Sequence, residues 1–167
     1  PGDPDWPAQL GDLTNCESVR EMGGAPLGLW VKGERVLADV VARSASVVGS
    51  RASSAYGDRV AADLAGGLAA AGVTVVSGGA FGIDAAAHRG SRAEDGPTVA
   101  GLAGGLDVPY PRAHAGLFAQ VAAKGLVVSE LPPGQHPTRH RFLARNRLIA
   151  ALTLGTVLVE AALRSGA

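Results

Sequence analysis

The residues best suited to binding chemistry lie in one short stretch towards the C-terminal end of the chain. It contains four arginines and an aromatic residue: Arg139, Arg141, Phe142, Arg145 and Arg147. No acidic residue occurs between Glu130 and Glu160, so the stretch is strongly positive. Guanidinium groups form paired hydrogen bonds with phosphate, and an aromatic ring can stack on a base. The pattern favours binding of a nucleotide or a nucleic-acid backbone; the alternative is a solvated basic helix face with Phe142 in the core.

A glycine turn at Gly49, Ser50 and Arg51 is a second candidate phosphate site. It follows an apolar run at 46–49 and precedes a stretch with helical spacing at 54–71. Free N–H groups and the helix dipole attract anions at the start of a helix, and the Arg51 side chain adds further donors. The alternative is a tight turn whose arginine is simply exposed to solvent.

A similar turn follows the next apolar run, at Ser77, Gly78 and Gly79. Glycines at such a position can form a concave set of backbone N–H groups that holds an anion, or they can only permit close packing of strand against helix. Ribose binding in a dinucleotide site needs an acidic residue at the end of this strand, and none is present. NAD is therefore not expected as a cofactor.

Three further side chains lie close to these turns. Asp84 and His88 are four residues apart on a predicted helix, so they share a face and could pair. A structural pair is favoured over acid–base catalysis, because no nucleophile or second carboxylate is recognisable nearby. Tyr110 ends a third glycine turn, where it either stacks on a base or anchors a loop between its two flanking prolines.

Apolar, β-branched runs alternate with helical stretches from residue 45 onward. The predicted strands are 46–49, 74–78, 98–105, 126–131 and 156–161, and the predicted helices are 54–71, 83–92, 113–123 and 141–152. This alternation predicts an α/β fold with a doubly wound, mostly parallel, Rossmann-like sheet. Ligands bind such sheets at the carboxyl ends of the strands, which is where the glycine turns would meet.

Residues 1–42 differ from the rest, since they are rich in proline and carry an excess of four acidic residues. We expect them to form a lead-in or flap, with an extra strand from the segment 27–33. Residues 43–167 would then form the Rossmann-like domain. Because the chain stops after one apolar strand and a single helical turn, this domain is expected to be incomplete at its C-terminal end.

The composition excludes several classes of protein. A hydrophobic content of 47% with 18% charged residues excludes an intrinsically disordered chain. The single cysteine, Cys16, excludes a disulfide scaffold and a cysteine-ligated zinc fold. No apolar stretch approaches the roughly 18 residues that span a bilayer, and the first residues lack a signal-peptide pattern. We therefore expect a cytoplasmic protein without a membrane partner, a metal or a cofactor.

Five motifs of this sequence together resemble the DNA-processing protein A family, DprA, also called Smf. They are VVGSRASSAYG, SGGAFGIDAAAHRG, AGGLDVPYP, SELPPG and RFLARNRLIAALT, in the family's order and spacing across residues 45–161. The resemblance implies an extended Rossmann fold in a bacterial cytosolic protein that is not an enzyme. It also implies binding of single-stranded DNA, protection of that DNA during natural transformation, and help in loading the recombinase RecA.

The family's binding residues map onto matching positions of this chain. They are Arg51, Arg89, Arg139, Phe142, Arg145, Asn146 and Arg147, and Phe142 is the residue implied to stack on a base. The family's dimer contacts lie in a later part of the Rossmann domain that this chain largely lacks. A homodimer is therefore implied for the full-length protein rather than for this chain.

Two other functions stay open on the sequence. The first is an enzyme similar to the LOG-type nucleoside-monophosphate phosphoribohydrolases, but their PGGxGTxxE loop has no counterpart with the right spacing here. Glu130 and Glu160 are the glutamates on which such an activity would depend. The second is a regulatory site for a free small nucleotide, which would use the same glycine turns.

Overall fold

The computed structural model describes residues 3–14 and 17–163 of the chain. Six strands form one sheet in the order β1-β5-β4-β3-β2-β6. Their bounds are β1 Trp30–Lys32, β2 Ser44–Val48, β3 Thr74–Ser77, β4 Thr98–Leu102, β5 Leu126–Ser129 and β6 Thr156–Leu158. All neighbouring strands are parallel except β1, which runs antiparallel to β5. The prediction of an α/β fold with a mostly parallel, Rossmann-like sheet is confirmed.

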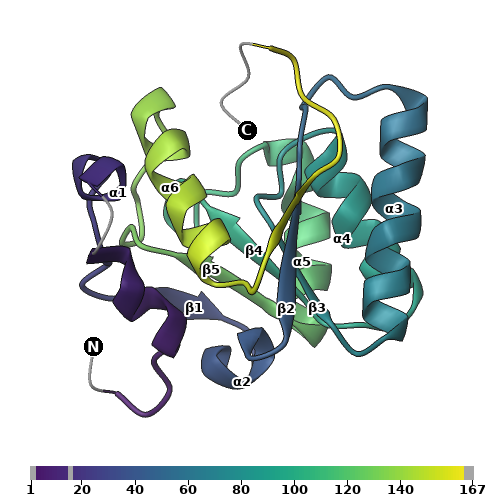
Figure 1. Cartoon of the computed structure of the whole chain (residues 1–167). Helices are drawn as coiled ribbons and strands as arrows, with labels where there is room; N and C mark the ends of the chain where they lie inside the picture. Colours follow the sequence, from purple (N-terminus) through teal and green to yellow (C-terminus); the bar gives the residue numbers. More distant parts are fainter. Residues whose placement is uncertain (1–2, 15–16, 164–167) are drawn as a thin grey trace.

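Helices cover both faces of the sheet (Figure 1). The longer ones are α3 Ala55–Ala70, α4 Ile83–Ala93, α5 Ala115–Lys124 and α6 Arg139–Ala151. Four shorter pieces are the 3-10 helices Ala8–Thr14 and Arg112–His114 and the α-helices α1 Glu17–Glu21 and α2 Leu37–Val41. Each of the four predicted helices is present, within a few residues of its expected bounds.

Alternate residues of the central strands build the core on the two faces of the sheet. Val75 packs with α3 and α4, whereas its neighbour Val76 packs with α6 and the lead-in. Both faces are covered, so every residue of β3, β4 and β5 is buried. This explains why these strands are mostly apolar instead of alternating between apolar and charged residues.

The lead-in adds a strand to the sheet, as the segment 27–33 predicted. Trp30 of β1 lies opposite Ser129 of β5. Leu10 and Leu13 of the first 3-10 helix and Leu37 of α2 enter the same core cluster as Leu148 of α6. The lead-in therefore shares a core with the sheet, and the proposed domain boundary at residue 42 stays a prediction.

Within the described residues, the helices are too short or too polar to cross a bilayer.

The predicted strand 98–105 ends earlier than expected, at Leu102. The backbone turns at Gly104 and Gly105, where an added Cβ would lie 2.9 Å and 2.6 Å from the carbonyl oxygens of Gln135 and Pro132. The loop after β5 packs against these glycines, so the strand cannot continue through them.

A candidate nucleic-acid interface at the carboxyl edge of the sheet

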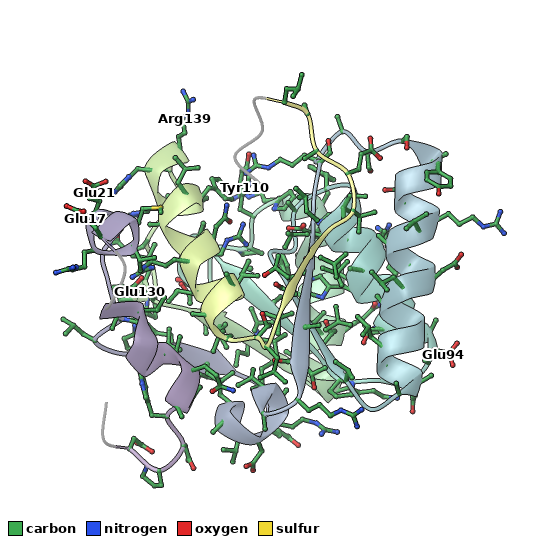
Figure 2. All side chains as sticks on the ribbon, viewed as in Figure 1. Glu17, Glu21, Glu94, Tyr110, Glu130 and Arg139 are labelled. Carbon is green, nitrogen blue, oxygen red and sulfur yellow. The ribbon has the colours of Figure 1, made fainter. Side chains whose placement is uncertain are left out.

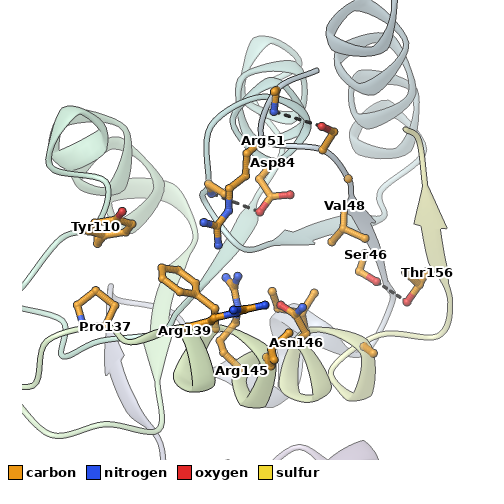
Figure 3. Close-up of a pocket in the computed structure, with 18 of the residues that line it drawn as sticks. Ser46, Val48, Arg51, Asp84, Tyr110, Pro137, Arg139, Arg145, Asn146 and Thr156 are labelled. Atoms are coloured by element: carbon orange, nitrogen blue, oxygen red, sulfur yellow. Dashed lines mark hydrogen bonds between the residues drawn. The ribbon is translucent and has the colours of Figure 1, made fainter. Parts of the chain in front are cut away.

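A cleft of about 830 Å³ opens at the carboxyl end of β2 and along α6. The side chains that give it chemical character are Arg51, Asp84, Tyr110, Arg139, Phe142 and Arg145. Arg51 and Asp84 come from one wall, beyond β2 and β3, and α6 supplies Arg145 and Asn146 on the opposite wall (Figure 3). The cleft therefore lies where the strand–helix alternation predicted a ligand site.

Phe142 lies inside this cleft and is half-buried. The Arg51 guanidinium carbon lies 4.5 Å from the centre of the Phe142 ring, and that of Arg145 lies 5.9 Å from it. The Tyr110 ring approaches from another side, with 5.5 Å between the ring centres. The alternative that placed Phe142 in the core is therefore wrong, and its ring is accessible beside two cations.

Arg145 forms the buried floor of the cleft. Its Nη1 donates hydrogen bonds to the carbonyl oxygens of Gly78 (2.8 Å) and Gly101 (2.6 Å). A Cβ on residue 78 would lie 2.2 Å from that nitrogen, so only glycine leaves room for the guanidinium. Burial lowers the pKa of Arg145 to about 10, and the nearby charge of Asp84 opposes this shift. Arg145 therefore stays positive near neutral pH and is rigidly held.

Asp84 lies beside this arginine in the wall of the cleft. Burial raises the pKa of its carboxyl group, while the charge of Arg145 and the backbone N–H of Ala80, 3.3 Å away, act in the opposite direction. The carboxylate offsets part of the positive charge at the cleft floor. Arg51 and Arg139, which are both exposed, thus provide the cleft's uncompensated charge.

His88 pairs with Thr98 and not with Asp84, the partner that the sequence had suggested. Asp84 and His88 share α4, but His88 is fully buried against β4 and its Nδ1 lies 2.8 Å from the Thr98 hydroxyl oxygen. That hydroxyl donates to the Val75 carbonyl, so His88 Nδ1 must carry the proton and donate to Thr98. Burial lowers the pKa of His88 to about 3, which keeps the ring neutral. Asp84, in the first turn of α4, reaches the cleft, whereas His88 lies one turn further along the same face of the helix and packs against β4.

The second glycine turn lies beneath the cleft. Ser77 donates its hydroxyl to the Val47 carbonyl, 2.7 Å away. Gly78 makes room for Arg145, and Gly79, at φ +67°, has Phe118 where a side chain would be. These three buried residues serve close packing, which is the alternative considered above, and they do not form an open anion site.

The first glycine turn borders the cleft, but the helix that follows it already has an anion. The Glu160 carboxylate accepts hydrogen bonds from the Ser54 backbone N–H (3.1 Å) and hydroxyl (2.9 Å) at the start of α3. The Glu160 carbonyl also accepts from the Ser50 N–H at 2.7 Å. The expectation of free N–H groups at this point is therefore wrong. Glu160 was missed because its partners become neighbours only when β6 pairs with β2.

The remaining basic residues divide between different surfaces. Arg147 is buried and bonds to the Glu130 carboxylate at 2.8 Å and to the Gly24 carbonyl at 2.8 Å. Glu130 lies between α6 and the lead-in, whereas Arg139 projects from the first turn of α6 (Figure 2). Positions 145 and 147 point to different sides because two residues turn a helix through more than half a circle. Arg147 thus holds the lead-in against α6, and Arg145 and Arg147 lie on different faces of this helix.

The expected binding residues fall into three groups. Gly49, Ser50, Arg51, Arg139, Phe142, Arg145 and Asn146 line the cleft; Ser77, Gly78 and Gly79 lie beneath it; Arg89 and Arg147 lie outside it. Arg89 is exposed on α4. Glu130 and Glu160, on which the phosphoribohydrolase alternative depends, do not line the cleft either. Across residues 3–14 and 17–163, no cluster of three or more His, Cys, Asp and Glu side chains could hold a metal ion.

The whole chain, residues 1–167, matches the family model of DNA recombination-mediator protein A. The chain belongs to this family. It is 52% identical to the putative DNA processing protein DprA of Mycobacterium tuberculosis, over all of this chain and 43% of that protein. It is 40% identical to the DNA processing protein DprA of Streptococcus pneumoniae, over 89% of this chain and 51% of that protein. The resemblance to the DprA/Smf family is thus confirmed.

Two solved DprA structures share the fold. DprA from Streptococcus pneumoniae superposes with a TM-score of 0.84 and 37% identity, over 98% of this chain and 54% of that one. DprA from Helicobacter pylori, whose structure is described as giving insight into a unique single-stranded DNA binding mode, has a TM-score of 0.78 and 28% identity, over 91% and 69% of the two chains. This chain therefore spans about half the length of the DprA relatives it matches.

Proposed function

We propose that this chain binds single-stranded DNA in the cleft, without regard to base sequence. The observation that carries the proposal is Phe142, a half-buried ring in an open cleft with Arg51 4.5 Å away and Tyr110 beside it. A base can stack on such a ring by displacing the Arg51 guanidinium that lies over it, and every base has a π face to offer. The DprA of Helicobacter pylori, described as a single-stranded DNA binder, supports the same substrate.

The charged residues have separate tasks in this proposal. Arg51 and Arg139 are exposed at the rim and bind backbone phosphates. Arg145, fixed to the carbonyls of Gly78 and Gly101, provides a preorganised positive floor that Asp84 partly neutralises. Because phosphates and ring faces are common to all nucleotides, such a cleft holds the strand with little discrimination between bases.

The finer function follows from family membership and belongs to the same proposal. The full-length protein would protect incoming single strands in the bacterial cytoplasm, act as a homodimer and help load RecA during natural transformation and recombination. In this role the domain is a binding protein and not an enzyme. Two contacts support a role without hydrolysis. The Glu130 carboxylate pairs with Arg147 and the Glu160 carboxylate accepts a hydrogen bond from Ser54, so the two glutamates on which a phosphoribohydrolase activity would depend already have structural partners.

The test is binding of a fluorescent oligo-dT strand and of a duplex of equal length, at several salt concentrations. With Arg51 and Arg139 binding phosphates at the rim of the cleft, the log–log salt slope for the single strand is expected to be roughly −1.4, from about −0.7 per phosphate contact. Arg51→Ala should weaken binding and make this slope less steep. Arg59→Ala, an exposed arginine of α3 outside the cleft, is the matched control and should change neither.

Two outcomes would contradict the proposal. A salt slope near zero would show that phosphates are not bound. Tighter binding of a free nucleoside monophosphate than of the oligonucleotide, with competition at the same site, would instead assign the cleft to a small nucleotide.

A further inference from the structure

We propose that Phe81 is a second base-stacking platform, so that a bound strand leaves the cleft and continues across the loop between β3 and α4. The inference rests on the proposed binding of single-stranded DNA. It extends the binding site beyond the residues that line the cleft.

The position of Phe81 follows from how its loop packs. Ala80 lines the cleft, and Phe81 is the next residue along the chain. At Gly82, with φ +71°, an added Cβ would lie 2.3 Å from the carbonyl oxygen of Ser50 and 2.8 Å from that of Arg51. The loop therefore rests directly on the turn that carries Arg51. Phe81 is thus placed next to the cleft wall and close to its main exposed cation.

The ring of Phe81 is held in place although 48% of the residue is exposed. Its centre lies 4.6 Å from that of the His114 ring, at an interplanar angle of 66°. His114 is itself buried, with Nδ1 2.9 Å from the Gly79 carbonyl oxygen and with Phe118 on its other side at 6.3 Å. An aromatic ring fixed in this way can accept a base without the entropic cost of first being ordered.

Exposure alone would not identify a platform, because single apolar residues on a protein surface are common. Phe81 differs in packing against the segment that also supplies an aromatic residue to the cleft. Tyr110, which is 50% exposed and packs on Phe142, lies on the same segment as His114, which packs on Phe81. Arg112, between Tyr110 and His114 in the sequence, is exposed and supplies a positive charge for a phosphate between the two platforms.

The experiment compares oligo-dT strands of increasing length on the native chain and on Phe81→Leu. Leucine keeps an apolar side chain against His114 but removes the π face. The variant should bind the shortest strand that fills the cleft as the native chain does, and should bind longer strands roughly 5- to 100-fold more weakly. Phe142→Ala should weaken the binding of strands of every length. Phe81→Trp should restore the length dependence, since a tryptophan ring can stack.

A matched control and a direct readout accompany this comparison. Tyr56→Leu removes another exposed aromatic ring, on the first turn of α3 outside the cleft, and should leave every affinity unchanged. Strands carrying a single 5-iodouracil should crosslink under ultraviolet light to the peptide containing Phe81. The reactive position along the strand should differ from the one that crosslinks to the peptide containing Phe142.

Failure of the inference can be told apart from failure of the proposed function. If Phe142→Ala weakens binding but Phe81→Leu matches the native chain at every length, the second platform does not exist. An equal loss at all lengths for Phe81→Leu would also overturn the inference, because Phe81 would then act only by supporting the cleft. If the native chain shows no preference for single strands, the proposed function fails and the inference fails with it.

Discussion

Replacing Gly78 with alanine tests whether Arg145 is fixed by the glycine turn beneath the cleft. The added Cβ would lie 2.2 Å from Nη1 and 2.6 Å from the guanidinium carbon of Arg145. Atoms cannot approach this closely, so either the backbone or the arginine must move. The guanidinium is nearly buried, at 7% exposure of the residue, which leaves it little room.

The cost follows from these two possibilities. If the backbone shifts and Arg145 stays, overpacking costs about 1–3 kcal/mol of unfolding free energy. If Arg145 leaves, it loses hydrogen bonds to the Gly78 and Gly101 carbonyls, each worth about 1.5–3 kcal/mol for a charged donor. We therefore expect Gly78→Ala to destabilise the chain by about 1–3 kcal/mol if the backbone shifts or about 3–6 kcal/mol if Arg145 leaves, and in the second case to weaken binding of single-stranded DNA.

Urea unfolding and oligo-dT binding, measured on the same samples, check this expectation. Gly67→Ala is the matched control, because it makes the same chemical change on an exposed position of α3 with no atom within 4 Å of the added Cβ. It should raise stability by about 0.5–1 kcal/mol, since alanine favours helix. The changes in unfolding free energy of the two variants should thus have opposite signs. A Gly78→Ala chain with native stability and native affinity would refute the fixed position of Arg145.

Three further predictions concern residues outside the cleft. Glu160→Gln should lower stability by about 1 kcal/mol in urea unfolding, because it weakens the cap of α3; an unchanged midpoint would contradict that role. Glu130→Gln should lower the free energy of unfolding by about 2 kcal/mol, because the buried Arg147 loses its charged partner, and should leave DNA affinity unchanged. A loss of DNA affinity in this variant would place Arg147 in the binding site. His88 has a pKa of about 3 in the folded chain against 6.5 in the unfolded one, so its contribution to stability is present above pH 6.5 and is lost as the pH falls towards 3. Relative to His88→Gln, the native chain should lose about 3 kcal/mol between pH 7 and pH 4, and parallel stability curves for the two proteins would show that His88 is not buried in its neutral form.

The local pattern of the sequence predicted most of the elements. Runs of valine bounded by glycine, such as 74–78, became strands because a parallel sheet covered on both faces needs apolar residues on both sides. Ser54 and Thr138 cap α3 and α6 with their side chains, so these helices begin where short polar residues interrupt the apolar pattern. The family was also evident from the sequence, since its motifs are contiguous segments.

The composition of the site was predicted better than its geometry. Arg51, Arg139, Phe142 and Arg145 meet in the cleft because the carboxyl ends of parallel strands share one edge and α6 crosses beside it. A count of arginines could not show that Arg147 turns to Glu130 and the lead-in. It also could not show that Arg145 is buried beneath the ring of Phe142 rather than exposed.

The fold class, the elements and the family could be predicted before the structure was known, because they depend on residue types and on spacing within one segment. The partners of the charged and polar side chains emerged only from the packing of the folded chain. Glu160 reaches Ser54 because β6 pairs with β2, and His88 reaches Thr98 because α4 packs over β4. These contacts join residues on different elements of the fold. Which partner each side chain meets depends on how the sheet and the helices on its two faces pack together, and no single segment of the sequence encodes that packing.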